Sequence, residues 1–272
     1  MTPFIKHALA GRTTAVNPAP LLILHRQFFF DKLIYGMSIA DNLTRVRERL
    51  EAAARRAGRS PAEITLMAVS KTHSAERIRE AYEAGQRIFG ENRVQEFAEK
   101  ATAVSSLPGA EFHLIGHLQT NKAKVAVELF GAIDSLDSLR LAIRLNEAAY
   151  RIGKTLPVLI EINVGGEKQK SGIAPCSPEL EELLQAVPQL QQLQVRGLMT
   201  VPPLTDDAEQ TRPYFRMLRE IRNDLATRCL PGIAFDVLSM GMSHDFEVAI
   251  EEGSTCVRVG TAIFGVRQKM EK

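Results

Sequence analysis

Apolar residues along this chain form short runs that alternate with stretches of helical spacing. Leu43, Val46, Leu50 and Ala53 recur every three or four positions, which predicts a helix over residues 41–57. Short, near-continuously apolar runs predict strands at residues 64–69, 88–89, 112–115, 132–135, 157–164, 193–200, 235–239 and 255–259. Further helices are predicted at residues 74–84, from 94 onward, and at 121–129, 137–151, 178–187, 207–228, 246–251 and 262–268.

This alternation of strands and helices predicts a parallel sheet, because each helix must return the chain to the end where the next strand begins. About eight strand–helix units follow one leading helix. That count fits an α/β fold, a single (β/α)8 TIM barrel with an extra N-terminal helix. A doubly wound open sheet is the alternative, but no Gly-x-Gly-x-x-Gly turn follows the first strand.

Polar residues gather where the predicted strands end, which is the working face of such a barrel. Lys71 closes the first strand. In apolar surroundings its ammonium loses hydration, which lowers the pKa of the amine and makes it a nucleophile toward an aldehyde. The alternative is a lysine whose charged end reaches solvent. Asn92 after the second strand and Met199 on the sixth are expected on the same rim.

The last two strand ends indicate a phosphate site. Ser243 stands where one helix is expected to begin, and Gly260 and Thr261 stand where the next begins. Helix N-termini expose unpaired N–H groups, and the loops after strands seven and eight are the usual phosphate site of this barrel. Ordinary helix capping also selects serine and threonine, so it remains the alternative for each residue taken singly.

Arg258 lies within the last predicted strand, between Val257 and Val259. If its side chain faces the barrel interior, it places a permanent positive charge there, because the guanidinium stays charged at any physiological pH. The alternative is an arginine that forms a salt bridge on the outside of the barrel.

Composition narrows the class of protein. Hydrophobic residues make up 45% and charged residues 24% of the 272 residues, as in a globular protein with a full core. The formal net charge of +2, from 34 basic and 32 acidic residues, gives no broad attraction to nucleic acid or to a membrane, and no stretch is apolar enough to span one. Three widely separated cysteines indicate a reducing compartment, so we expect a cytoplasmic protein.

Residues 1–36 differ from the rest of the chain, and we divide the sequence into this N-terminal extension and a barrel over 37–272. The extension is basic and has no acidic residue before Asp31. An organellar transit peptide has this composition, whereas a secretory signal fits less well because the apolar part is short and interrupted. We favour a third interpretation, an upstream-extended start with Met37 as the natural first residue, because recognisable folding signals begin just after it.

Six segments in a fixed order carry a resemblance to a known family. They are AVSK at 68–71, FGEN at 89–92, HLIGHLQTNK at 113–122, GLM at 197–199, SMGMS at 239–243 and RVGTAIFG at 258–265. Together they resemble the pyridoxal phosphate homeostasis proteins, the YggS/PROSC family, whose fold is similar to the N-terminal domain of alanine racemase. The resemblance runs from about Ile39 to the C-terminus.

The resemblance implies a barrel that holds pyridoxal 5′-phosphate (PLP) as an aldimine on Lys71. Ser243, Gly260 and Thr261 would hold the phosphate, and Arg258 would lie near the pyridine nitrogen. The cofactor-binding set expected on this basis is Lys71, Asn92, Met199, Ser243, Arg258, Gly260 and Thr261. The family is associated with vitamin B6 homeostasis and has no established turnover, so we expect a monomer that buffers PLP or delivers it to apo PLP-dependent enzymes. Lys170 also fits a family pattern and is a candidate secondary site.

The main alternative is a PLP-dependent racemase of the alanine racemase type. That reaction needs a tyrosine as a second base, supplied with the help of a second, β-rich domain. No such domain follows the eighth unit, and the four tyrosines, at 35, 82, 150 and 214, are not expected on the rim. A cation beside the ring nitrogen also weakens the cofactor as an electron sink. A Schiff-base aldolase acting on a phosphorylated sugar is the third class, which the six segments disfavour.

Overall fold

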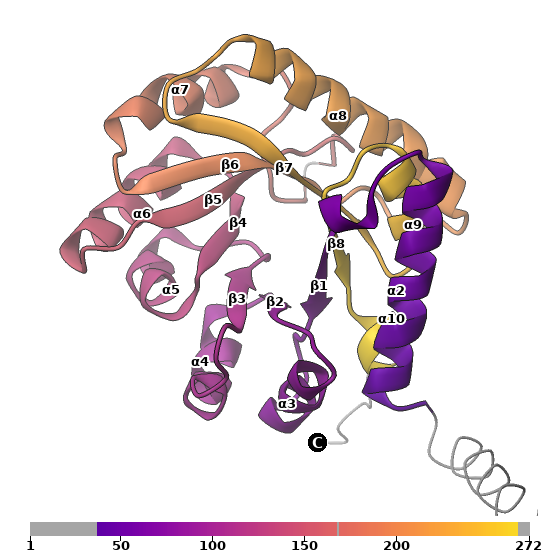
Figure 1. Ribbon diagram of the computed structural model, residues 1–272. Helices are drawn as coiled ribbons and strands as arrows, with labels where there is room; N and C mark the ends of the chain where they lie inside the picture. Colours follow the sequence, from indigo (N-terminus) through magenta and orange to yellow (C-terminus); the bar gives the residue numbers. More distant parts are fainter. Residues whose placement is uncertain (1–36, 168, 266–272) are drawn as a thin grey trace, which may run out of the picture. The chain divides into compact units, whose positions relative to one another are not determined.

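The computed structural model describes residues 37–167 and 169–265 and forms a closed barrel of eight parallel strands with helices around it (Figure 1). The strands are β1 (Thr65–Val69), β2 (Ile88–Glu91), β3 (Glu111–Leu114), β4 (Ala132–Leu136), β5 (Leu156–Glu161), β6 (Leu193–Met199), β7 (Ile233–Met242) and β8 (Cys256–Val259). Their order around the barrel is their order in the sequence, and β8 pairs with β1 to close it. The predicted (β/α)8 barrel is confirmed.

Helices connect the strands on the outside of the barrel (Figure 1). They are α2 (Ile39–Arg56), α3 (Ala75–Glu83), α4 (Val94–Val104), α5 (Ala123–Leu129), α6 (Leu139–Arg151), α7 (Pro178–Ala186), α8 (Arg212–Thr227), α9 (Phe246–Glu251) and α10 (Thr261–Phe264). Short 3₁₀ turns add η1 (Pro61–Glu63), η2 (Thr120–Lys122), η3 (Val187–Gln189) and η4 (Ala208–Thr211).

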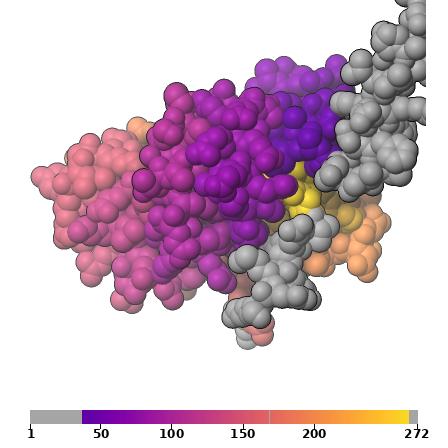
Figure 2. All heavy atoms as spheres, turned by 90° about the horizontal axis from the view of Figure 1, so that it is seen from below, coloured from indigo at the N-terminus to yellow at the C-terminus, as the bar shows by residue number. Residues whose placement is uncertain are grey.

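Helix α2 is the expected extra helix before the first strand. Its buried face carries Leu43, Val46, Leu50 and Ala53, the residues whose spacing predicted it. That face packs against α9, α10 and α3, so the helix covers the place where the last strand meets the first. In Figure 2 the yellow residues near the C-terminal end lie beside the indigo residues of α2.

Strand β7 extends beyond its predicted end at Ser239, as far as Met242. Gly241 makes this possible, because it has a φ of 94°, a conformation that glycine adopts without strain. A Cβ at Gly241 would also lie 2.5 Å from the Cβ of Ala249 in α9. The glycine therefore lets the strand continue past a shift in its register with β8 while α9 packs closely against it.

Other elements also differ from the prediction at their ends, and two of them show a physical reason or a local consequence. The helix expected at 207–228 begins as the 3₁₀ turn η4 and becomes α-helical only at Arg212, because Pro213 lacks an N–H group and is tolerated only in the first turn. The strand expected at 157–164 ends at Glu161, and Ile162 makes only an isolated bridge to Ile173.

The prediction of a distinct extension over residues 1–36 lies outside the described residues. The end of the helix predicted at 262–268 also falls partly outside them, since α10 is described only over Thr261–Phe264. Within the described residues, none of the helices has the length and apolar character needed to cross a membrane.

Candidate functional site

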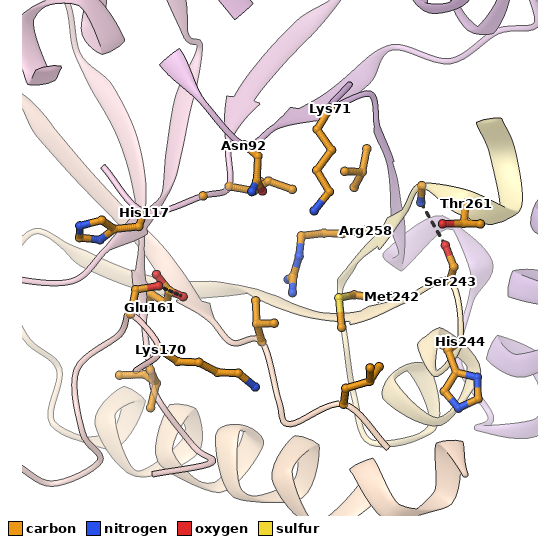
Figure 3. A pocket seen from close by; sticks show the side chains of 18 of the residues that line it. Lys71, Asn92, His117, Glu161, Lys170, Met242, Ser243, His244, Arg258 and Thr261 are labelled. Atoms are coloured by element: carbon orange, nitrogen blue, oxygen red, sulfur yellow. Dashed lines mark hydrogen bonds between the residues drawn. The ribbon is translucent and has the colours of Figure 1, made fainter. Parts of the chain in front are cut away.

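A pocket of about 860 Å³ opens where the barrel strands end at their C-terminal sides (Figure 3). It brings together residues that are far apart in the sequence but adjacent around the barrel. Of the residues expected at the site, those that line it are Lys71, Asn92, Ser243, Arg258, Gly260 and Thr261. Its volume lies within the range typical of small-molecule sites.

Lys71 is the second residue after the end of β1, and its side chain extends into the pocket toward Arg258 (Figure 3). The next residue, Thr72, has a φ of 65°, which is uncommon for a β-branched residue. Its N–H group donates a hydrogen bond to the carboxylate of Glu96. The backbone at Lys71 is therefore held in a tight turn that directs the amine into the pocket.

Ser243, Gly260 and Thr261 lie together at the ends of β7 and β8, next to the turn that carries Lys71, because β8 pairs with β1. Figure 3 shows Ser243 and Thr261 to the right of Lys71. The Ser243 Oγ accepts hydrogen bonds from the N–H groups of Gly260 (3.1 Å) and Ala262 (3.4 Å), at the start of α10. A Cβ at Gly260 would lie 3.3 Å from the carbonyl oxygen of Val69, so glycine suits the close approach of β8 to β1. This corner of the pocket concentrates backbone N–H and hydroxyl donors.

The expectation that Ser243 begins its own helix is corrected. The residue at the N-cap position of α9 is Asp245, and Ser243 precedes it by two residues. The Asp245 Oδ1 accepts a hydrogen bond from the N–H group of Met242 at 2.6 Å, which closes the turn between β7 and α9. Because of that turn, the Ser243 hydroxyl reaches the next helix along the chain, α10.

Arg258 lies inside the barrel, so the alternative of a salt bridge on the outside is excluded. Its side chain is almost fully buried, and the guanidinium donates hydrogen bonds to the Ser239 Oγ and the Thr200 carbonyl oxygen, both at 2.7 Å. Burial lowers the pKa of Arg258, while Cys256 and nearby buried carboxyl groups act in the opposite direction. The two hydrogen bonds fix a cation at the floor of the pocket.

Asn92 lines the pocket beside Lys71, whereas Met199 does not line it. Gly116 makes room for Asn92, because a Cβ at Gly116 would lie 2.3 Å from the Asn92 carbonyl oxygen. Met199 is fully buried at the end of β6, where it pairs with Glu161 and Ser239 of the neighbouring strands.

Glu161, at the end of β5, lines the pocket and did not figure among the predicted residues. Its Oε1 accepts a hydrogen bond from the Ser171 hydroxyl at 3.0 Å, and its Oε2 has no hydrogen-bond partner among the described residues. Burial raises the pKa of the Glu161 carboxyl group, against the effect of the Ser171 hydrogen bond. The available signal was a lone charge closing an apolar strand, the same signal that marked Lys71.

Lys170, the candidate secondary residue, lines the same pocket as Lys71 (Figure 3). Its amine donates a hydrogen bond to the Pro202 carbonyl oxygen at 3.2 Å and forms an ion pair with Glu167. The two lysines therefore approach one cavity from different sides.

Comparison with known proteins places this geometry in a family. Residues 42–268 match the family model described as alanine racemase, N-terminal domain. The "Pyridoxal phosphate homeostasis protein" of Aquifex aeolicus is 47% identical over 232 residues, which cover 85% of this chain and all of that protein. The chain belongs to the pyridoxal phosphate homeostasis protein family.

Solved structures agree with this assignment. PipY of Synechococcus elongatus, a structure with PLP bound, is 40% identical and superposes with a TM-score of 0.74, covering 84% of this chain and all of that one. An alanine racemase of Clostridium difficile superposes with a TM-score of 0.65 at 17% identity. The match covers 85% of this chain and 58% of the racemase chain. That more distant likeness shows a shared barrel fold.

Proposed function

We propose that this protein binds PLP at Lys71 and takes part in vitamin B6 homeostasis by holding the cofactor and delivering or buffering it. The observation that carries the proposal is one pocket that contains a lysine amine and, at the neighbouring ends of β7 and β8, the hydroxyl groups of Ser243 and Thr261. The PLP-bound state of the PipY relative supports the same cofactor here.

The residues present fit this cofactor. When bound, PLP supplies an aldehyde that condenses with a primary amine, a pyridine ring and a phosphate. The Lys71 amine suits the aldehyde, and the hydroxyls of Ser243 and Thr261 suit the phosphate. The Gly260 backbone can approach a phosphate closely because it carries no Cβ.

Arg258 determines what chemistry the site favours. Its buried, hydrogen-bonded guanidinium holds a positive charge in the pocket and offers no proton to a ring nitrogen at neutral pH. A pyridine nitrogen beside it stays unprotonated, which disfavours storage of a negative charge in the ring. This supports a carrier in preference to an enzyme that removes a proton from an amino acid.

The described tyrosines support the same interpretation. Tyr82 lies in α3, Tyr150 in α6 and Tyr214 in α8, and none of the three lines the pocket. Tyr35 lies outside the described residues. Racemisation needs a second base opposite the lysine, and these tyrosines do not supply one. We therefore propose no catalytic turnover, with apo PLP-dependent enzymes of the cytoplasm as recipients.

The first prediction concerns the covalent attachment at Lys71. After reduction with borohydride, a peptide map of the protein incubated with PLP should carry the label on Lys71. Lys71→Ala should lose the reducible adduct, because no other amine is directed from the end of β1. Lys170→Ala is the matched control, since Lys170 lines the same pocket and its loss should leave the label in place. A label on another amine, with Lys71 unmodified, would contradict the proposal.

Delivery is tested by a separate measurement on the same holo-protein. The loaded protein should restore activity to an apo-aminotransferase while a trap removes free aldehyde from solution. Failure to reactivate the enzyme in the presence of the trap would leave a buffering role and remove the delivery role.

A further inference from the structure

The turn that carries Lys71 rests on a buried ion pair. The Lys100 amine in α4 lies 3.0 Å from the Oε1 of Glu91, the last residue of β2. The Glu91 side chain has no exposed surface, and that of Lys100 is 10% exposed. Neither residue lines the pocket, so neither touches a ligand bound there.

The Lys100 amine also reaches the backbone on both sides of Lys71. It donates hydrogen bonds to the carbonyl oxygens of Ser70, at 3.1 Å, and His73, at 3.0 Å. Glu91 contacts the same turn, because its Oε1 accepts a hydrogen bond from the Ser70 hydroxyl at 2.5 Å. One amine therefore spans the turn from the residue before Lys71 to the second residue after it.

The Lys100 amine is surrounded by acceptors, so its three N–H donors are all engaged. The two backbone carbonyls and the Glu91 carboxylate are the nearest acceptors, and the Glu96 Oε1 lies 3.5 Å away. Burial raises the pKa of Glu91, and the nearby Lys100 charge and the Ser70 hydrogen bond oppose that effect. Buried charges are costly, and their directional bonds specify one geometry where apolar side chains would allow several.

We propose that Lys100 is a positioning residue that holds the turn so that the Lys71 amine points into the pocket. The inference rests on the proposed role of Lys71. Attack on an aldehyde requires an aligned amine, and a misplacement of about 1 Å can slow a reaction by up to about a hundredfold. The hydrogen bonds that hold the phosphate corner join Ser243 to Gly260 and Ala262, and Lys100 makes none of them.

The test compares Glu91→Gln with the double variant Glu91→Gln/Lys100→Met. Glu91→Gln removes the buried carboxylate and leaves Lys100 with the partly exposed Glu96 carboxylate, 3.5 Å away, as its charged partner. The double variant removes both members of the buried pair, so the two variants differ by the Lys100 charge and its hydrogen bonds. In the double variant, the adduct on Lys71 should form on the order of tenfold more slowly or worse. Binding of pyridoxine 5′-phosphate, which has a phosphate but no aldehyde, should stay within about twofold, since the affected step is amine alignment.

Lys154→Met is the matched control. The Lys154 amine donates hydrogen bonds to the carbonyl oxygens of Val127 and Phe130 in the same manner, far from the pocket lining. Its loss should destabilise the barrel without changing the rate of adduct formation. An equal slowing in this variant would mean that the effect is general loosening, and would overturn the positioning role.

Amide hydrogen exchange in the protein without PLP gives a second readout. Exchange in residues 70–75 should be faster in the double variant than in Glu91→Gln and unchanged in Lys154→Met. Unchanged exchange, or faster exchange with an unchanged adduct rate, would overturn the inference. If the unmodified protein forms no adduct at Lys71, the proposed function fails instead, and that result is visible before any variant is compared.

Discussion

Ser243 shows how one hydroxyl group can organise a corner of the pocket. Its Oγ accepts two N–H groups at the start of α10, which leaves its own O–H proton available to a ligand. A phosphate in this corner would find the hydroxyl groups of Ser243 and Thr261 within one small region. The two side chains should therefore contribute to phosphate binding.

Ser243→Ala and Thr261→Val should each weaken PLP binding. One hydrogen bond to a charged group contributes about 1.5–3 kcal/mol, which corresponds to roughly a 10- to 100-fold loss of affinity. Pyridoxal, which lacks the phosphate, should bind far more weakly than PLP to the unmodified protein and should be little affected by either change. Titrations of both ligands measure the effect.

Ser138→Ala provides the control for these substitutions. The Ser138 hydroxyl caps α6 by accepting the N–H group of Leu141, so its loss costs stability, about 1 kcal/mol, without touching the phosphate corner. Equal affinity of the unmodified protein for PLP and pyridoxal would argue against a phosphate site here.

Individual residues could be predicted where a local pattern reveals them. Lys71 closes an apolar strand, and Gly260 and Thr261 follow the last strand directly, so their place on the rim follows from topology. Lys100 gave no such signal, because it sits among polar residues of a helix and its role depends on Glu91 and Ser70 across the fold. The Ser243 hydroxyl was expected near its own helix, because the turn closed by Asp245 cannot be read from spacing.

At the scale of elements, β3 and β4 are joined by a charged pair in which the Asp134 carboxylate is buried and the His113 side chain is 19% exposed. The His113 Nδ1 lies 3.2 Å from the Asp134 Oδ1, and both line a smaller pocket of about 320 Å³ at the opposite end of the barrel from Lys71. Burial alone lowers the pKa of His113, but the charge and hydrogen bond of Asp134, aided by Glu111, outweigh it and raise the pKa to about 10.

This pair should make the barrel's stability depend on pH. Histidine in an unfolded chain titrates near pH 6.5, so the folded state binds an extra proton between about pH 6.5 and 10. The stabilisation is complete below pH 6.5 and is lost as the pH rises toward 10, with a slope of up to about 1.4 kcal/mol per pH unit. Urea denaturation at several pH values measures it.

The control replaces both partners, as His113→Gln/Asp134→Asn, so that no buried charge is left unpaired. The double variant should lose less stability than the unmodified protein over the same pH range. Parallel pH curves for the two proteins would show that the pair does not titrate in this way.

The extents of the elements could be predicted only in part. Apolar runs located all eight strands, since buried parallel strands are apolar on both faces. Their ends were less predictable, because Gly241 lets β7 run on and Pro213 delays the start of α8, and both effects depend on the backbone conformation of single residues.

At the scale of the whole molecule, the barrel could be predicted because eight strand–helix units leave few other closed arrangements. The residues that line the pocket were less predictable, since they come from the ends of β1, β2, β3, β5, β6, β7 and β8 or from the loops that follow these strands. Their side chains meet only after the barrel closes. Glu161 enters the site in this way, through the curvature that brings β5 opposite β1.

The assembled pocket should not racemise amino acids. The holo-protein should retain the α-deuteron of labelled L- or D-alanine, because Arg258 disfavours charge storage and the described tyrosines lie outside the pocket. Loss of the deuteron can be followed by mass spectrometry, with an alanine racemase as the positive control. Loss of the deuteron over multiple turnovers that disappears in Lys71→Ala would support the racemase alternative and contradict the carrier role.

The pairing of β8 with β1 also bears on the protein's synthesis. Lys71 and Thr261 are separated by most of the chain, yet the strand pairs Met67–Arg258 and Ala68–Val259 bring their two loops together. A ribosome makes Lys71 early and the phosphate corner almost last. A growing chain therefore carries the amine long before the residues proposed to bind the phosphate are present. Any aldehyde captured at Lys71 during translation would be held by the covalent bond alone. If Lys71 binds the cofactor as proposed, selective retention would begin only when β8 docks on β1.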